Sequence, residues 1–377
     1  MKIGIEAQHL FREKKYGREM FILELIKSLQ TIDTKNDYVI FVKPGMDNAC
    51  VQKTLSFKIV EVKGSPPAYW DQMALNRAVK NEGCDVLHCT SGTAPLRCTL
   101  PLILNVNEYP GKHAPVWFRT RLQKKIHSLY ERWNIPLAIK KAHRIIVPNK
   151  HGLNTIEKHF KNRVKETSII YNGTAKHFRK IDDRKHLEAI RRKYKLPGKF
   201  LMCFGSVDKQ KNLKNLLLGY SVYLSKNKDI PLVIVDLTKN DLNRILKKIG
   251  KPELKEQIHL TDYIINSDLP AIYNLCEVFL YPSRCEKLGL PVMEAMACRA
   301  PVLTSKTSAM AEIAGDAAYL ADPDDPEKIS LGIYRLISNK SLRNKNQEKG
   351  LQRAAKFNWL DTARNYIKEY EAAGKSS

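Results

Sequence analysis

The chain has 377 residues, of which 43% are apolar and 27% are charged. This length exceeds what one hydrophobic core usually supports, so we expect two domains, and the composition excludes a disordered or collagen-like chain. The 64 lysines and arginines outnumber the 39 acids, and the resulting net charge of +25 favours a polyanionic partner: nucleic acid, an anionic membrane face or a phosphate-bearing small molecule.

The longest apolar runs are far shorter than the ~20 residues that a membrane-spanning helix needs. Glu6 interrupts the N-terminus early, so no secretory signal is expected. The eight cysteines form no paired CxxC cluster of the kind that binds zinc or exchanges disulfides, which favours reduced thiols packed as small hydrophobic groups. These features predict a cytoplasmic protein.

Short apolar strands alternate with amphipathic helical stretches along the first half of the chain. The predicted strands are Lys2–Ala7, Tyr38–Val42, Lys58–Val62, Val86–Cys89, Leu102–Val106, Arg144–Val147 and Ser168–Tyr171. Helical patterns such as Glu19–Leu29 and Asn154–Phe160 lie between many of them. This alternation is typical of an α/β fold with a doubly wound, mostly parallel sheet that carries helices on both faces.

The alternation pauses between Tyr171 and Gly198, where an Asn-Gly turn signal precedes a strongly basic stretch. A second set of strands follows: Phe200–Phe204, Leu232–Val235, Gln257–Leu260, Val278–Leu280, Pro301–Thr304 and Ala318–Leu320. The closing segments, Ser341–Lys356 and Asp361–Glu371, are helical in pattern. We therefore predict two Rossmann-like domains joined near residues 172–198.

Two acids flank a predicted helix start after the strand that ends near Leu280. Glu286 lies in the loop, the helix begins around Gly289 to Pro291, and Glu294 projects from its first turns. Free N–H groups near Gly289 and Leu290 attract phosphate. One carboxylate can contact a sugar while the other binds a ribose diol, although the same spacing also occurs by chance at helix starts with two solvated acids.

The segment Tyr281–Cys298 resembles the retaining glycosyltransferases of family four, whose Glu-x7-Glu motif reads here as Glu286 to Glu294. Lys287 and Arg299 depart from the small residue and the glycine usual there. Further matches cover nearly the whole chain. They are Tyr16–Arg18, Ser168–Gly173, Leu201–Leu213, Thr261–Tyr273 and Ser308–Pro323.

The resemblance implies a role for each matching residue. Glu286 orients the donor sugar, Glu294 binds the ribose hydroxyls and Lys211 neutralises the charge of the donor diphosphate. Glu286 and Lys211 are therefore the implied catalytic residues. The implied donor-binding residues are Gly17, Asn107, Gly205, Ser206, Lys211, Tyr263, Ile264, Glu286, Gly289, Leu290 and Glu294.

Three of these positions depart from the family pattern. Gly17 is alone where two glycines are usual, and Ser206 replaces a common arginine whose charge Lys209 could supply. Asn107 and Glu108 stand where the family often has His-Asp, and an asparagine donates a hydrogen bond to a hydroxyl but does not titrate.

The fold that the resemblance implies is GT-B, in which two Rossmann-like doubly wound domains face one another across a cleft. We expect an acceptor-side domain at 1–175, a nucleotide-sugar-binding domain at 176–355, and a last helix at 356–377 that returns to the first domain. The implied activity is metal-independent hexosyl transfer, without a cofactor and with retention, to a glycan or lipid-linked acceptor. Such an enzyme would serve cell-envelope polysaccharide or lipopolysaccharide synthesis at the inner face of the cytoplasmic membrane.

Other functions stay open at this point. A sugar-nucleotide epimerase or a phosphorylase uses the same fold, and the departures at Asn107 and Ser206 are compatible with a partner that has lost activity. A nucleic-acid-binding protein rests on charge alone, because no RNA- or DNA-binding motif accompanies it, so no nucleic acid is expected as a partner.

Two remaining motifs have a structural and a functional interpretation. Asp322-Pro-Asp324 resembles a metal-binding Asp-x-Asp motif, but its place before a helix favours an N-terminal cap, and we predict no metal site there or at His88 and Cys89. The segment 117–133 is a basic amphipathic helix whose apolar side chains either pack on the N-terminal sheet, which we favour, or lie on an anionic membrane. Those side chains are Phe118, Leu122, Ile126, Leu129 and Trp133.

Overall fold

The computed structural model describes residues 1–107, 121–226, 230–286 and 288–375, and it divides the chain into two units. Unit 1 comprises Met1–Gly173 together with Asn358–Ser377, and unit 2 comprises Thr174–Phe357. The chain passes from unit 1 to unit 2 after Gly173 and returns to unit 1 after Phe357.

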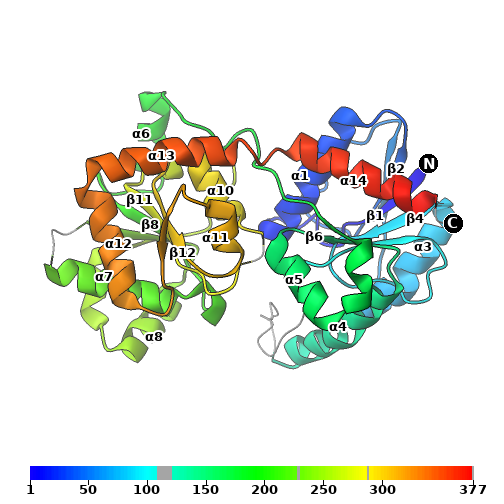
Figure 1. Ribbon diagram of the computed structural model, residues 1–377, viewed down its shortest axis with the longest axis horizontal. Coiled ribbons are helices and arrows are strands. Elements are labelled where there is room, and N and C mark those ends of the chain that lie inside the picture. Colours follow the sequence, from blue (N-terminus) through cyan, green and yellow to red (C-terminus); the bar gives the residue numbers. More distant parts are fainter. Residues whose placement is uncertain (108–120, 227–229, 287, 376–377) are drawn as a thin grey trace. The chain divides into compact units, whose positions relative to one another are not determined.

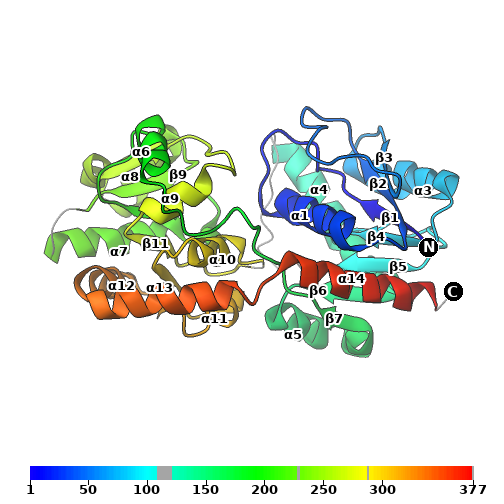
Figure 2. The same ribbon diagram turned by 90° about the horizontal axis from the view of Figure 1, so that it is seen from above.

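Unit 1 is built on a parallel sheet whose strand order is β3-β2-β1-β4-β5-β6-β7 (Figure 2). The strands are β1 (Lys2–Glu6), β2 (Asp37–Val42), β3 (Phe57–Glu61), β4 (Val86–Cys89), β5 (Leu102–Asn105), β6 (Arg144–Val147) and β7 (Thr167–Ile169). Each predicted strand of this half is present, with ends that differ by one or a few residues. The order reverses between β1 and β4, and such a switch point is where ligands bind in open α/β sheets.

Helices cover the sheet of unit 1. They are α1 (Gly17–Ile32), α2 (Pro67–Tyr69), α3 (Asn76–Glu82), α4 (Arg121–Lys141), α5 (Lys150–His159) and α14 (Trp359–Gly374), with a π-helix η1 (Trp70–Leu75) and a 3-10 turn η2 (Lys161–Glu166). Figures 1 and 2 show α14 alongside α1. Tyr366 and Tyr370 of α14 bond to Asn105 and to the fully buried His88, at 2.8 and 2.9 Å, which ties the C-terminal helix to unit 1.

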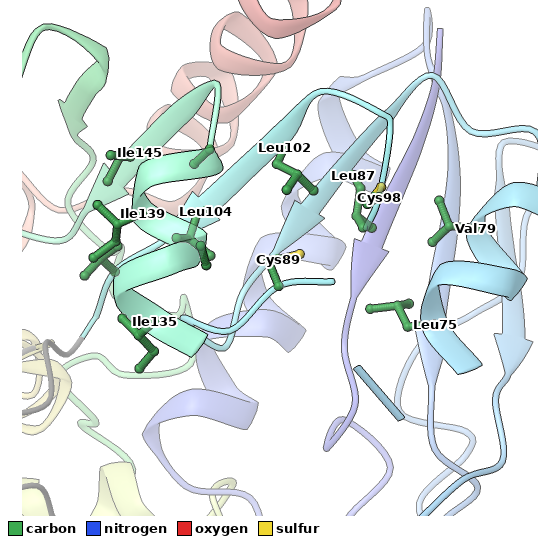
Figure 3. Close-up of a cluster of buried hydrophobic side chains, with 14 of the residues drawn as sticks. Leu75, Val79, Leu87, Cys89, Cys98, Leu102, Leu104, Ile135, Ile139 and Ile145 are labelled. Carbon is green, nitrogen blue, oxygen red and sulfur yellow. The ribbon is translucent and has the colours of Figure 1, made fainter. Parts of the chain in front are cut away.

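The core between the sheet and α3 and α4 is apolar and close-packed (Figure 3). Ile135 and Ile139 of α4 lie over Leu104 of β5, while Leu75 and Val79 cover the other end near Leu87. Branched aliphatic side chains dominate because parallel strands are buried on both faces.

The prediction that Ile126, Leu129 and Trp133 pack into this core is wrong. Their exposed fractions are 55%, 71% and 56%, because α4 continues beyond the predicted segment to Lys141 and buries Ile135, Ala138 and Ile139 instead. Phe118 and the side chain of Leu122 lie outside the described residues. Among the described helices, none combines the length and the apolar character that a bilayer-spanning segment requires.

Unit 2 contains a parallel sheet of order β10-β9-β8-β11-β12-β13, of which Figure 1 labels β8, β11 and β12. The strands are β8 (Leu201–Phe204), β9 (Leu232–Val235), β10 (Ile258–Thr261), β11 (Val278–Tyr281), β12 (Val302–Ser305) and β13 (Tyr319–Ala321). The helical elements are α6 (Arg184–Lys193), η3 (Lys209–Lys211), α7 (Leu213–Lys226), α8 (Lys239–Ile249), η4 (Pro252–Gln257), α9 (Leu269–Leu275), α10 (Leu290–Ala297), α11 (Ser308–Ala314), α12 (Pro326–Ser338) and α13 (Lys340–Ala354). Two Rossmann-like sheets were predicted, and both are present.

The basic stretch that was expected to join the domains belongs to unit 2. Asp183 caps α6 by accepting a hydrogen bond from the backbone of His186, and α6 packs against α9. Only its apolar residue Ile190 is buried, so the basic side chains of this helix lie toward solvent. A strongly charged sequence therefore reflects one exposed helix face here, not a linker.

Candidate functional site

The strand order of unit 2 reverses between β8 and β11, so the loops that leave these two neighbouring strands start at the same edge of the sheet (Figure 1). The loop after β8 carries Gly205, Ser206 and, in the short turn η3, Lys211. The loop after β11 carries Glu286 and leads into α10. The topology thus brings together residues that are far apart in the sequence.

Lys211, Tyr281 and Glu286 form a hydrogen-bonded triad at this edge. The ammonium of Lys211 donates to the hydroxyl of Tyr281 over 3.0 Å and forms an ion pair with Oε2 of Glu286. The hydroxyl of Tyr281 donates to the same carboxylate oxygen over 2.5 Å. The Glu286 side chain is 10% exposed and that of Lys211 is 30% exposed, so the charges lie at the border between protein and solvent.

The electrostatics of the triad keep the lysine charged and the phenol protonated. Burial by itself lowers the pKa of Lys211, but Tyr281 and the carboxylate of Glu286 raise that pKa above its ordinary value. Burial, and then the charge of Glu286, raise the pKa of Tyr281. A permanent ammonium and a neutral hydroxyl therefore stand beside one carboxylate at neutral pH.

The two loops are tied to each other by their backbones. The carbonyl of Gln210 accepts hydrogen bonds from the hydroxyl of Ser283 and the backbone N–H of Arg284, both at 2.8 Å. Asn212, in the left-handed conformation with φ of 63°, donates from its side chain to the carbonyl of Pro282 over 2.9 Å. These bonds fix Lys211 relative to Glu286, which is the preorganisation that a binding site for a charged ligand requires.

Glu294 lies on α10 and contacts a different partner. Its Oε2 accepts a hydrogen bond from the buried Tyr273 over 3.4 Å. The helix starts at Gly289, whose φ of 66° is left-handed and where a Cβ would stand 2.3 Å from Cδ1 of Ile313. A glycine is therefore required at the turn that brings the Glu286 loop into the helix.

The remaining predicted residues of unit 2 line the loops after β8 and β10. A Cβ on Gly205 would lie 2.4 Å from Cβ of Leu237, and the Ser206 hydroxyl accepts a hydrogen bond from the backbone of Asp208 over 3.1 Å. Tyr263 is half-buried and Ile264 is buried in the loop after β10. Ser206 thus shapes a turn, and Lys209 in the same loop is exposed.

Comparison with known proteins decides what this unit is. Residues 187–353, which include Lys211, Glu286 and Glu294, match the family model of the glycosyl transferases group 1. We call this matched part, residues 187–353, the glycosyltransferase domain. The sequence resemblance to family-four glycosyltransferases is thereby confirmed.

Two relatives are similar to this chain over about half of its length. Serotype-specific mannosyltransferase WbdA of Escherichia coli is 28% identical over 212 residues, which are 55% of this chain and 26% of that protein. O-antigen chain mannosyltransferase B of Escherichia coli is 28% identical over 184 residues, 48% of each chain. The aligned stretches thus span half or less of these two relatives.

The fold of the whole chain is GT-B, as the resemblance implied. A sucrose-phosphate synthase from Thermosynechococcus elongatus superposes with a TM-score of 0.77 over 100% of both chains, at 17% identity. At this identity the likeness shows the fold alone.

Two implied donor-binding residues lie in unit 1, outside the glycosyltransferase domain defined by the family model. Gly17 begins α1, where the backbone of Tyr16 donates to Glu19 over 3.2 Å in a capping box. Asn107 follows β5 and is half-buried. Glu108 lies outside the described residues.

The acidic stretch before α12 caps that helix. Asp325 accepts hydrogen bonds from the backbone of Glu327 and Lys328, at 2.9 and 3.3 Å. Asp322 pairs with Lys306 at 3.0 Å. Across the described ranges, no group of His, Cys, Asp and Glu side chains is arranged to hold a metal ion.

Three residues of the glycosyltransferase domain were missed by sequence reasoning: Tyr281, Tyr273 and Asn212. Tyr281 is the last residue of the buried strand β11. A tyrosine at this position predicts that its hydroxyl lies at the edge of the sheet where the loops begin. Tyr273 lies on α9 and Asn212 follows Lys211, and neither has a local pattern that predicts its bond to a distant loop.

Proposed function

We propose that this chain transfers the hexosyl group of a nucleoside diphosphate hexose to a hydroxyl group of a cell-surface glycan. The configuration at the anomeric carbon is retained. The observation that carries the proposal is the Lys211–Tyr281–Glu286 triad at the switch point of unit 2. It lies within the matched group 1 glycosyltransferase range.

In the proposed reaction, the bond between the anomeric carbon and the diphosphate oxygen breaks, and the diphosphate leaves with the electron pair. The acceptor hydroxyl oxygen forms the new bond to that carbon, and its proton passes to the leaving diphosphate. The ammonium of Lys211 has three hydrogens, and two of them go to Tyr281 and Glu286. The third hydrogen is available for a diphosphate oxygen, whose charge grows as the bond breaks. The N–H groups near Gly289 and Leu290 at the start of α10 add positive potential.

The two glutamates take different parts in this proposal. Glu286, held by a cation and a hydroxyl, orients the donor sugar and supports positive charge at its ring. Glu294 accepts hydrogen bonds from the ribose, with Tyr273 holding its carboxylate in place. The base of the donor lies by Tyr263 and Ile264, and Gly205, Ser206, Gly17 and Asn107 complete the donor contacts. Because Lys211 and the helix start supply the charge, we propose that neither metal nor cofactor is needed.

We also propose that the acceptor is a lipid-linked or membrane-bound glycan at the cytoplasmic face of the membrane. Both relatives are named as mannosyltransferases, one of them of the O-antigen chain. Helix α4 exposes Ile126, Leu129 and Trp133 next to the exposed Arg132, which fits an anionic lipid surface. The net charge of +25 also attracts the chain to an anionic membrane surface.

The test is a transfer assay with the purified chain. Uridine, guanosine and adenosine diphosphate hexoses serve as donors, octyl glycosides of mannose, glucose and galactose serve as acceptors, and EDTA is present throughout. We expect one donor to give a product with the donor's anomeric configuration. Lys211→Ala should abolish transfer, whereas Lys255→Ala, which changes an exposed lysine of η4 in the same unit, should not. Absence of transfer from every donor, or equal activity of Lys211→Ala, would refute the proposal.

A further inference from the structure

A second polar cluster lies at the switch point of unit 1, where β1 and β4 are neighbours. Its centre is Asp71, which lies in the π-helix η1 and is only 6% exposed. Oδ2 of Asp71 accepts hydrogen bonds from the hydroxyl of Thr93, in the loop after β4, over 2.7 Å and from the hydroxyl of Tyr130 on α4 over 3.0 Å. Three elements thus meet at this carboxyl group.

The neighbouring acid Glu6, at the end of β1, is bonded differently. Its two carboxylate oxygens accept four hydrogen bonds, from the backbone of Gln8, Thr90 and Ser91 and from the hydroxyl of Thr90, at 2.8 to 3.1 Å. Glu6 is therefore saturated and holds the two loops together. Asp71 receives donors on Oδ2, whereas none of the described residues donates to Oδ1.

Gln8, whose backbone bonds to Glu6, carries a buried donor that lacks an acceptor among the described residues. Gln8 is 6% exposed, and its side-chain Nε2 has no hydrogen-bond partner among the described residues. The backbone of Gln8 is fixed, because its N–H donates to Glu6 and its carbonyl accepts from Lys43 over 3.3 Å. A buried amide without an acceptor is costly unless a ligand or a water supplies one.

The residues on both sides of Asp71 are locked in place. Trp70 is fully buried and donates from its indole to the carbonyl of Val62 over 2.8 Å. Gln72 donates to the carbonyl of Ala94 and to Tyr130, at 2.8 and 2.7 Å, and accepts from the backbone of Leu96. π-helices are rare and are frequent at functional sites, and this one carries an aspartate whose position is determined on every side.

The ionisable groups around Asp71 come from each element packed against it: Glu6 on β1, Lys43 after β2, Cys89 on β4, and His127 and Tyr130 on α4. Burial, and then the charge of Glu6, raise the pKa of Asp71 to about 7. At neutral pH this carboxyl group therefore exists in both forms, and at higher pH it is an acceptor only.

We propose that Asp71 binds the acceptor sugar, with Oδ1 accepting a hydrogen bond from one of its hydroxyls and the amide of Gln8 donating to another of its oxygens. The inference rests on the proposed function and names the residue that holds the second substrate. A neutral sugar fits this site because its hydroxyls both donate and accept. The diphosphate does not fit, because a carboxylate would repel it.

The experiment uses Asp71→Asn, with Asp33→Asn as a matched control in the same unit. Asp33 is also a buried acid, but both of its oxygens are fully used, by Lys35, Asn36 and Tyr38. The probes are the octyl glycoside that accepts sugar from the wild-type chain and the nucleoside diphosphate that raises its melting temperature. Both variants are assayed for kcat and KM of the acceptor and for the thermal shift caused by the nucleotide.

We expect Asp71→Asn to lower kcat/KM for the acceptor by about 10- to 100-fold, because one hydrogen bond to a charged group is lost. The rise in melting temperature caused by the nucleotide should stay the same. Gln8→Ala should lower the same constant less, and Asp33→Asn should leave it unchanged. Unchanged acceptor kinetics in Asp71→Asn, or equal loss of the nucleotide shift, would overturn the inference. A wild-type chain that transfers no sugar would instead overturn the proposed function.

Discussion

Tyr281 donates a hydrogen bond to Glu286 over 2.5 Å, on the carboxylate oxygen that also pairs with Lys211. The tyrosine ends β11, the glutamate follows five residues later and the lysine comes from the turn after β8. One oxygen therefore links two loops of the glycosyltransferase domain, and the position of the lysine depends on both partners.

Replacing the carboxylate of Glu286 should separate binding from turnover. Glu286→Gln keeps the shape of the side chain and removes a negative charge beside the proposed diphosphate site. We expect turnover to fall by about 100-fold or more, the effect of losing a preorganised electrostatic contact. Nucleoside diphosphate affinity should be equal or higher, because a repulsive charge is gone.

The matched control for this change is Glu277→Gln, which alters a half-buried glutamate paired with Arg343 in the same unit. Its transfer rate should match that of the wild type. Steady-state kinetics and calorimetric titration with the diphosphate measure both effects. A Glu286→Gln variant that turns over normally would show that this carboxylate has no part in the reaction.

The hydroxyl of Tyr281 should matter through its two hydrogen bonds. Tyr281→Phe keeps the ring, which stacks on Phe279 at 5.6 Å between centroids, and removes the bonds to Lys211 and Glu286. We expect kcat/KM for the donor to fall about 10-fold, since each hydrogen bond to a charged group contributes modestly. Tyr220→Phe, which removes a buried hydroxyl that donates to the backbone carbonyl of Ile230, should lower stability without this kinetic effect.

Stability should depend on pH through Asp71. The pKa of this carboxyl group is raised from 3.8 to about 7 in the folded chain, so the folded state keeps a proton that the unfolded state has lost. The free energy of unfolding therefore falls as pH rises from about 3.8 to about 7. Above pH 7 the folded protein carries the full destabilisation caused by the buried, ionised carboxylate. Asp71→Asn lacks the titration and should melt higher than the wild type at pH 8, with a smaller difference at pH 5. Scanning calorimetry at both pH values tests this, and an equal difference at the two would contradict it.

Removing the exposed apolar side chains of α4 should weaken binding to anionic lipid. The triple variant with Ile126, Leu129 and Trp133 changed to serine loses three side chains, each worth about 1.5 to 3 kcal/mol when buried, so vesicle affinity should fall at least about 100-fold. Sedimentation with phosphatidylglycerol vesicles measures it. Leu55→Ser, which alters a fully exposed leucine after β2, is the control. Equal sedimentation of the triple variant and the wild type would rule out this face as the membrane contact.

Much of the fold was predictable because buried parallel strands are short, apolar and separated by helices. The predicted strands are present, and their ends differ by only a few residues. The strand order was not contained in these local patterns. It is the order that brings Lys211 next to Glu286, and only the family resemblance placed both at one donor site.

Helix α4 and Asp71 show where local patterns failed. Apolar spacing at Ile126, Leu129 and Trp133 predicts that a helix has an apolar face, but it does not predict which face the sheet will cover. The face that the sheet covers is the one that carries Ile135 and Ile139, and both residues lie beyond the predicted segment. Asp71 is one acid in an unremarkable stretch, and its significance arises from Thr93 and α4, which are distant in sequence.

The most direct test is binding of nucleoside diphosphates to the wild-type chain and to Lys211→Ala, measured as a shift in melting temperature with uridine, guanosine and adenosine diphosphate. A ligand that binds the folded state must raise this temperature. We predict a saturable rise with one of the three, lost in Lys211→Ala and kept in Lys255→Ala, which changes an exposed lysine of the same unit. No rise with any diphosphate, or an undiminished rise in Lys211→Ala, would contradict the assignment of the triad as the donor site.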